Sequence, residues 1–223
     1  LDHCGYLPKL VKDGFAGNIH ATPYTCKLVD VILRDSARLQ TEDAKFAQRH
    51  GFSKHNPALA LYNEQDAEKA IHKLRPEEYG TRVQIARETF VTWHPSGHIL
   101  GAAFVEVEFF GKRILFTGDL GRDEHPLLAG PGDIPAGHWD AIVTESTYGD
   151  REHEPQTTDF ESAINATVAR GGSVLIPAFA VDRTEVILVR LRELVEQGRI
   201  PAVPIYADSP MALRALSFYR DAI

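Results

Sequence analysis

The first third of the chain places hydrophobic residues at the spacing of an α-helix. In residues 24–40 they recur every three or four positions, which predicts an amphipathic helix. The polar residues 41–56 predict a short helix and a loop. Asn63 followed by Asp66 resembles a helix start, and the same spacing continues this predicted helix until Pro76.

The pattern then changes to the alternation that is typical of strands. Three segments show it, residues 88–93, 104–109 and 113–117. Gly111 and Lys112 separate the last two, so we expect these two segments to form a hairpin. After a loop rich in Gly and Pro, residues 141–144 predict a further strand that ends at Glu145. Because a strand presents alternate side chains to one face, we expect the aromatic residues of this region to pack in the core: Trp93, Phe109, Phe110 and Phe116.

Helices and strands are predicted to alternate in the last third of the chain. Helices are expected at residues 158–169 and 182–197 and from Ser209 onward, with strands at 173–176 and 203–206. Such alternation predicts a parallel, layered α/β region. The polar residues 149–155 precede it, so we place a domain boundary there, with one domain at 1–148 and a second at 149–223.

Composition narrows the class of protein. With 223 residues, 43% of them hydrophobic, the chain is long enough to bury a core. No apolar run approaches the roughly 20 residues that span a bilayer, so we expect no membrane association. Cys4 and Cys26 lack the spacing of a zinc knuckle or a disulfide framework, which indicates the cytoplasm. The net charge of −7 argues against a basic protein that coats nucleic acid, but a nuclease with bound divalent metals is compatible with it.

Candidate chemistry gathers at the ends of the predicted hairpin. The start of its first strand and the end of its second lie at one sheet edge, so His98 and Asp119 should come together. Flanking glycines allow sharp turns there, and Glu145 follows a strand to the same rim. Asp2 and His3 add a second imidazole and carboxylate. Each residue alone is more often structural, but together they supply the donors that zinc or manganese prefers.

These residues lie in motifs that resemble the metallo-β-lactamase fold, and most closely its β-CASP branch of RNA- and DNA-processing nucleases. Residues 1–8 (LDHCGYLP) resemble the end of a His-x-His-x-Asp-His motif whose first half would precede Leu1. The other matching segments are 96–102 (SGHILGA), 116–121 (FTGDLG), 144–149 (TESTYG), 171–181 (GGSVLIPAFAV) and 208–212 (DSPMA). The resemblance covers nearly the whole chain in the expected order.

The resemblance implies a fold and a metal centre. The fold would be an αββα sandwich, truncated at its N-terminus and followed by part of a β-CASP α/β domain. Two divalent metal ions, zinc or alternatively manganese, would share an activated hydroxide that attacks a phosphodiester. Asp2 and His3 would bind the second metal and His98 the first. Asp119 would bridge both.

The resemblance also assigns catalytic roles. Asp2 is carried over as a catalytic residue as well as a ligand. Glu145 would orient a histidine that acts as general acid and is not in this sequence. Arg183 is a candidate from its position and not from the resemblance: it begins a predicted helix that faces the cleft and could contact a phosphate, but a solvated arginine fits this position at least as well. The substrate would be RNA, with DNA as the alternative, and a homodimer is left open.

Two other functions compete with a ribonuclease. A small-molecule hydrolase of the same fold is one, but the segment from Glu145 onward resembles an insert that such enzymes lack. The other is a non-catalytic scaffold subunit of an RNA-processing complex. The residues immediately upstream of Leu1 would discriminate, since His-x-His there supports an enzyme.

We predict that the 223 residues by themselves bind metal poorly and are inactive, because the resemblance places further histidine ligands outside them. Metal content after dialysis and cleavage of labelled RNA by the purified chain check this. Robust metal-dependent cleavage by these residues alone would contradict it.

Overall fold

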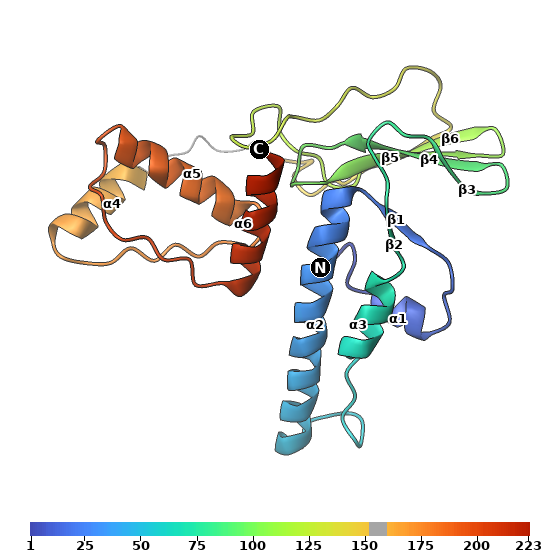
Figure 1. Ribbon diagram of the computed structural model, residues 1–223, viewed down its shortest axis with the longest axis horizontal. Coiled ribbons are helices and arrows are strands. Elements are labelled where there is room, and N and C mark those ends of the chain that lie inside the picture. The colour runs from blue at the N-terminus through green and yellow to red at the C-terminus, as the bar shows by residue number, and fades with distance from the viewer. Residues whose placement is uncertain (152–159) are drawn as a thin grey trace.

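The computed structural model describes residues 1–151 and 160–223 and has a mixed α/β architecture, as the sequence predicted (Figure 1). One group of helices accompanies the strands, α1 (Leu7–Lys12), α2 (Pro23–His50) and α3 (Glu64–Ile71). A second group follows later in the chain, α4 (Phe160–Ala169), α5 (Arg183–Glu196) and α6 (Pro210–Ala222). The predicted domain boundary after residue 148 adjoins residues 152–159, which are outside the described part of the chain, so the boundary stays a prediction.

The main sheet positions the candidate site. Its strands are β3 (Val83–Ala86), β4 (Thr89–Pro95), β5 (Ala103–Phe109), β6 (Lys112–Phe116) and β7 (Ala141–Val143), paired in that order. The first four run antiparallel and β7 joins β6 in parallel, so the predicted strands from residue 88 to 144 are confirmed. Phe109 pairs with Lys112. The hairpin loop is therefore Phe110 and Gly111, whose φ angles of 47° and 77° are both positive, as a type I′ turn requires.

Helix α2 is longer than the sequence predicted. It starts where Thr22 accepts a hydrogen bond from the Thr25 amide at 3.3 Å, with Pro23 in the first turn. It ends at Gly51 in the left-handed conformation. We expected a loop within residues 41–56, but helix continues to His50 because this stretch is rich in Ala, Glu, Lys, Gln and Arg, which are good helix formers.

Helix α3 begins as predicted and ends early. The Asn63 side chain accepts from the Asp66 amide at 3.0 Å, and the Asp66 carboxylate accepts from the Asn63 amide at 3.2 Å. The predicted continuation to Pro76 is wrong. Residues Leu74–Pro76 instead form β2, which pairs in parallel with β1 (Ile19–Ala21). A distant strand thus supplies backbone partners that the local pattern does not reveal.

The two predicted strands of the last third are not formed among the described residues. Residues 173–176 and 203–206 pair with no strand and instead line a hollow of about 880 Å³ beside α4, α5 and α6. Leu175 is 93% exposed. A parallel sheet needs backbone partners as well as hydrophobic residues, so the predicted parallel layering is wrong for this structure. The helices around it are confirmed, with residues 158–159 of the first outside the described residues.

The aromatic residues of the sheet divide into two kinds. Trp93 is buried, as predicted, and its ring stacks with that of His20. The prediction is wrong for Phe109, Phe110 and Phe116, which are exposed. Alternation shows which side chains share a face of a sheet, but not whether another element covers that face.

Two apolar clusters hold the helices. The first joins α2, α3 and the loop before α3 through seven buried residues, Cys4, Val29, Leu33, Ala37, Tyr62, Ala67 and Ala70. The second joins α4 and α5 through Ile164, Leu191, Leu194 and Ile200. Both cysteines are free thiols, and no helix in the described ranges is long and apolar enough to cross a membrane.

We predict that Leu33→Ala lowers the free energy of unfolding by about 2–5 kcal/mol, because Leu33 is 0% exposed and its removal leaves a cavity. Leu39→Ala is the matched control on the same helix. Leu39 is 44% exposed, so its truncation should change stability by less than about 0.5 kcal/mol. Urea unfolding of both variants checks this, and equal losses would contradict it.

Candidate metal centre

Two distant parts of the chain converge on the carboxylate of Asp119. Its Oδ2 atom lies 3.2 Å from His3 Nε2 and 3.6 Å from His98 Nε2. Asp2 Oδ2 lies 3.4 Å from the same His3 nitrogen. The four residues that the sequence proposed as metal ligands are therefore neighbours in space, although 117 positions separate Asp2 from Asp119.

The hairpin brings His98 and Asp119 together as expected. Val105 near the start of β5 pairs with Phe116 at the end of β6, so the flanking turns emerge at one edge of the sheet. The His98 turn is closed by a hydrogen bond from the Ser96 amide to the Ala102 carbonyl, 3.1 Å. Placement of both side chains thus follows from strand register rather than from contacts between them.

Glycine is required where the two turns meet. The Gly121 amide donates to the Ser96 carbonyl at 2.8 Å. A Cβ atom at Gly121 would lie 2.0 Å from the carbonyl carbon of Gly97, where no atom fits. Gly97 itself has a φ of 68°, and a Cβ there would lie 2.7 Å from the Pro131 nitrogen. The His98 turn and the loop after Asp119 are therefore in contact backbone to backbone.

The start of α2 supports the same turn. The Gly101 carbonyl accepts hydrogen bonds from the hydroxyls of Thr22 at 2.6 Å and Thr25 at 2.8 Å. Thr22 is also the N-terminal cap of α2, so one buried hydroxyl both starts the helix and fixes the turn that carries His98.

Glu145 lies beside Asp119, as its position after β7 predicted. Its Oε1 atom accepts from the Leu120 amide at 2.8 Å, and its own amide donates to the Thr117 hydroxyl at 3.4 Å. The carboxylate therefore holds the residue that follows Asp119. Together with Asp2 and Asp119 it gives this edge a concentration of negative charge that favours cations.

Arg183 is not brought to this cluster by any contact in the described part of the chain. It lies exposed in the first turn of α5.

The residue before Arg183, Asp182, which the sequence indicated only as a helix start, does contact the loops that carry His98 and Asp119, directly or through Tyr219. Asp182 Oδ1 accepts from the Tyr219 hydroxyl at 2.9 Å, and that hydroxyl accepts from the Leu100 amide at 3.1 Å. No local sequence signal distinguishes this aspartate from an ordinary helix cap.

The second oxygen of Asp182 binds the loop after Asp119. Its Oδ2 atom lies 3.1 Å from His125 Nε2, while His125 Nδ1 accepts from the amides of Leu127 at 3.1 Å and Leu128 at 3.0 Å. Nδ1 is thus an acceptor, and Nε2 carries the proton that His125 donates to Asp182. Glu185, one turn further along α5, is buried, and burial raises the pKa of its carboxyl.

The donor set suits a transition metal. Two donor atoms at about 2.1 Å from a tetrahedral ion are about 3.4 Å apart, close to the two separations at Asp119. Imidazole and carboxylate are the donors that zinc and manganese share. In the described residues, no group of three or more His, Cys, Asp and Glu side chains is arranged to hold an ion as it stands. The residues therefore fit a metal by type and pairwise spacing.

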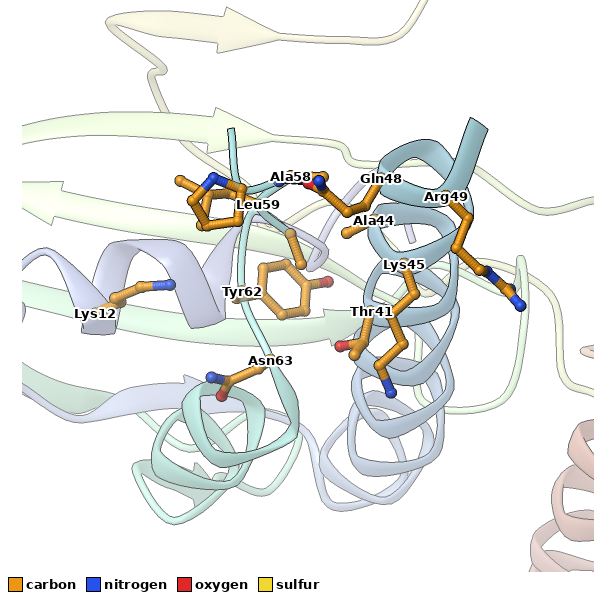
Figure 2. A pocket seen from close by; sticks show the side chains of 12 residues that line it. Lys12, Thr41, Ala44, Lys45, Gln48, Arg49, Ala58, Leu59, Tyr62 and Asn63 are labelled. Carbon is orange, nitrogen blue, oxygen red and sulfur yellow. Dashed lines mark hydrogen bonds between the residues drawn. The ribbon is translucent and has the colours of Figure 1, made fainter. Parts of the chain in front are cut away.

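A separate surface hollow, near the C-terminal half of α2, contains none of these residues (Figure 2). Its volume is about 700 Å³, and Tyr62 forms part of its wall. The Tyr62 hydroxyl lies 2.7 Å from the hydroxyl of Ser36. Its lining offers amide, hydroxyl and basic groups but no carboxylate or imidazole, so it is not the candidate metal centre.

Comparison with known proteins agrees with the motifs. No family model matches the chain. Ribonuclease TTHA0252 of Thermus thermophilus is 36% identical over 222 residues, which are 98% of this chain and 46% of the relative. Endoribonuclease YSH1 of Eremothecium gossypii is 32% identical over all of this chain and 29% of its own length. Cleavage and polyadenylation specificity factor subunit 3 of Dictyostelium discoideum is 31% identical, over all of this chain and 28% of its own.

The chain belongs to the β-CASP branch of the metallo-β-lactamase family, as its motifs indicated. It spans about half the length of the first of these relatives and under a third of the other two.

We predict that Gly121→Ala weakens metal binding and lowers the thermal stability, because the added methyl group forces the His98 turn away from Asp119. Gly132→Ala is the matched control in the same loop, since its Cβ would meet nothing closer than 3.5 Å. Thermal unfolding and titration with Co²⁺ check both variants in the full-length gene product. Similar behaviour of the two would show that the Gly97 contact does not position the ligands.

Proposed function

We propose that the chain forms part of a metal-dependent ribonuclease that hydrolyses phosphodiester bonds in RNA processing or degradation. The observation that carries this proposal is the convergence of His3 and His98 on one carboxylate, that of Asp119, with Asp2 beside His3. Similarity over 98% of the chain to a protein named as a ribonuclease supports RNA as the substrate, with DNA as the alternative.

Two divalent metal ions are proposed as cofactors, zinc or alternatively manganese. His98 would hold one ion, Asp2 and His3 the other, and Asp119 would bridge them. Bound metals at this edge would lower the pKa of a water and offset charge on the phosphate oxygens. The chain's part is to hold the donors in place, and the contacts at Gly97, Gly101 and Gly121 do this before any ion binds.

Glu145 and Arg183 are proposed to have supporting roles in the reaction. Glu145 keeps the backbone after Asp119 in place and, by family resemblance, orients a general acid from elsewhere in the protein. Arg183 is exposed in the first turn of α5, where its guanidinium is free to meet a phosphate oxygen.

The finer architecture is part of the same proposal. Residues 1–148 would belong to an αββα sandwich and 149–223 to the inserted β-CASP domain. The cytoplasm stays the predicted compartment, and the oligomeric state stays open.

A non-catalytic scaffold subunit is the second candidate. It would fit if the further histidine ligands expected outside these residues are replaced, whereas the four donors present here, Asp2, His3, His98 and Asp119, count against it. A small-molecule hydrolase has no comparable support, since the similarity to two ribonucleases covers 98% and 100% of the chain and so includes most of residues 149–223.

We predict that the full-length gene product cleaves 5′-labelled RNA and that chelator abolishes cleavage. His98→Ala and Asp119→Asn should each lower kcat by roughly 100-fold or more, since even outer-shell changes at metal sites cost about 10- to 100-fold. His72→Ala is the control, because His72 is exposed at the end of α3. Undiminished cleavage in chelator would sink the metal mechanism, and RNA binding without cleavage would support the scaffold.

A further inference from the structure

One carboxylate joins the second group of helices to both loops of the candidate metal centre. Through Oδ1, Asp182 binds the Tyr219 hydroxyl, which in turn holds the Leu100 amide two residues from His98. Through Oδ2 it binds His125, in the loop that follows Asp119. Each oxygen therefore serves a different ligand loop.

The backbone of Asp182 adopts a conformation that its local sequence does not favour. Its φ of 72° and ψ of −53° lie outside the usual regions for a side-chain-bearing residue. Its carboxylate makes no capping hydrogen bond to α5, the ordinary use of an aspartate at a helix start. Such a conformation persists only where surrounding contacts determine it, and here those contacts are Tyr219 and His125.

The hydrogen bonds of Asp182 to Tyr219 and His125 are shielded from water, which strengthens them. Tyr219 is 2% exposed, and both Asp182 and His125 are largely shielded from water. Burial raises the pKa of Tyr219, so its hydroxyl keeps the proton that it donates to Asp182. Hydrogen bonds to an ionised acceptor are strong when water is excluded, and a water molecule would replace them poorly.

We propose that Asp182 and Tyr219 are positioning residues of the metal centre. They hold the His98 turn and the Asp119 loop at the separation that ligation needs, so metal affinity depends on the attachment of α5 and α6. This inference rests on the proposed metal centre. It adds that residues of the second helical group, none of them ligands, set the affinity.

The test measures Co²⁺ binding by the full-length gene product. Titration gives the affinity, and the visible absorption bands of the bound ion report its coordination. Tyr219→Phe removes the hydrogen bonds to Leu100 and Asp182 while keeping the ring. Asp182→Asn keeps shape and tolerates a positive φ, but its amide nitrogen donates and cannot accept a hydrogen bond, so the bond from either Tyr219 or His125 is lost. Each variant should bind Co²⁺ about 10-fold more weakly, the lower end of outer-shell effects at metal sites.

Tyr62→Phe is the matched control. Tyr62 is as buried as Tyr219, and its substitution removes a hydroxyl contact with Ser36, but it lies in the cluster of α2 and α3 (Figure 2). If Tyr219 has a purely structural role, Tyr219→Phe and Tyr62→Phe should both lower the melting temperature, and both should leave Co²⁺ affinity and absorption unchanged.

The outcomes separate this inference from the proposed function. Weaker Co²⁺ binding and altered bands in Tyr219→Phe and Asp182→Asn, with Tyr62→Phe like wild type, support the inference. Wild-type Co²⁺ affinity in both variants overturns it and leaves the metal centre intact. Absence of Co²⁺ binding by the unaltered protein overturns both proposals.

Discussion

The close approach of Gly97 and Gly121 is the constraint on which the candidate site depends. It places the turn before β5 and the turn after β6, which lie at the same end of the hairpin, in direct backbone contact, with the Gly121 amide bonded to the Ser96 carbonyl. No side chain fits between them. His98 and Asp119 extend from either side of this contact, so their separation is set by the backbone and not by the flexibility of their side chains.

Local signals predicted the parts of the fold that local interactions determine. Asn63 and Asp66 marked the start of α3, and the alternation beside Gly111 marked the hairpin, from which the meeting of His98 and Asp119 follows directly. Non-local pairing was not predictable. The β1–β2 pair joins Ile19 to Leu74, and residues 173–176 have strand composition without a partner.

Asp182 shows why the supporting contacts of a site are harder to infer than its ligands. An aspartate before a helix has an ordinary explanation, and nothing nearby in the sequence indicates that its carboxylate reaches Tyr219 and His125 instead. Helix α6 packs against both α2 and α5. The His98 turn is therefore held by Thr22 from the first group of helices and by Tyr219 from the second.

The unpaired extended segment at residues 173–176 affects the tendency of the chain to associate with other chains. Residues 173–176 present backbone amides and carbonyls without strand partners. Leu175 within this segment and Phe179 just after it are exposed and apolar. Such a segment is a template on which another extended chain can add. Concentrated solutions of these residues will tend to self-associate through it, and a charged residue in place of Leu175 is the change that would oppose aggregation most directly.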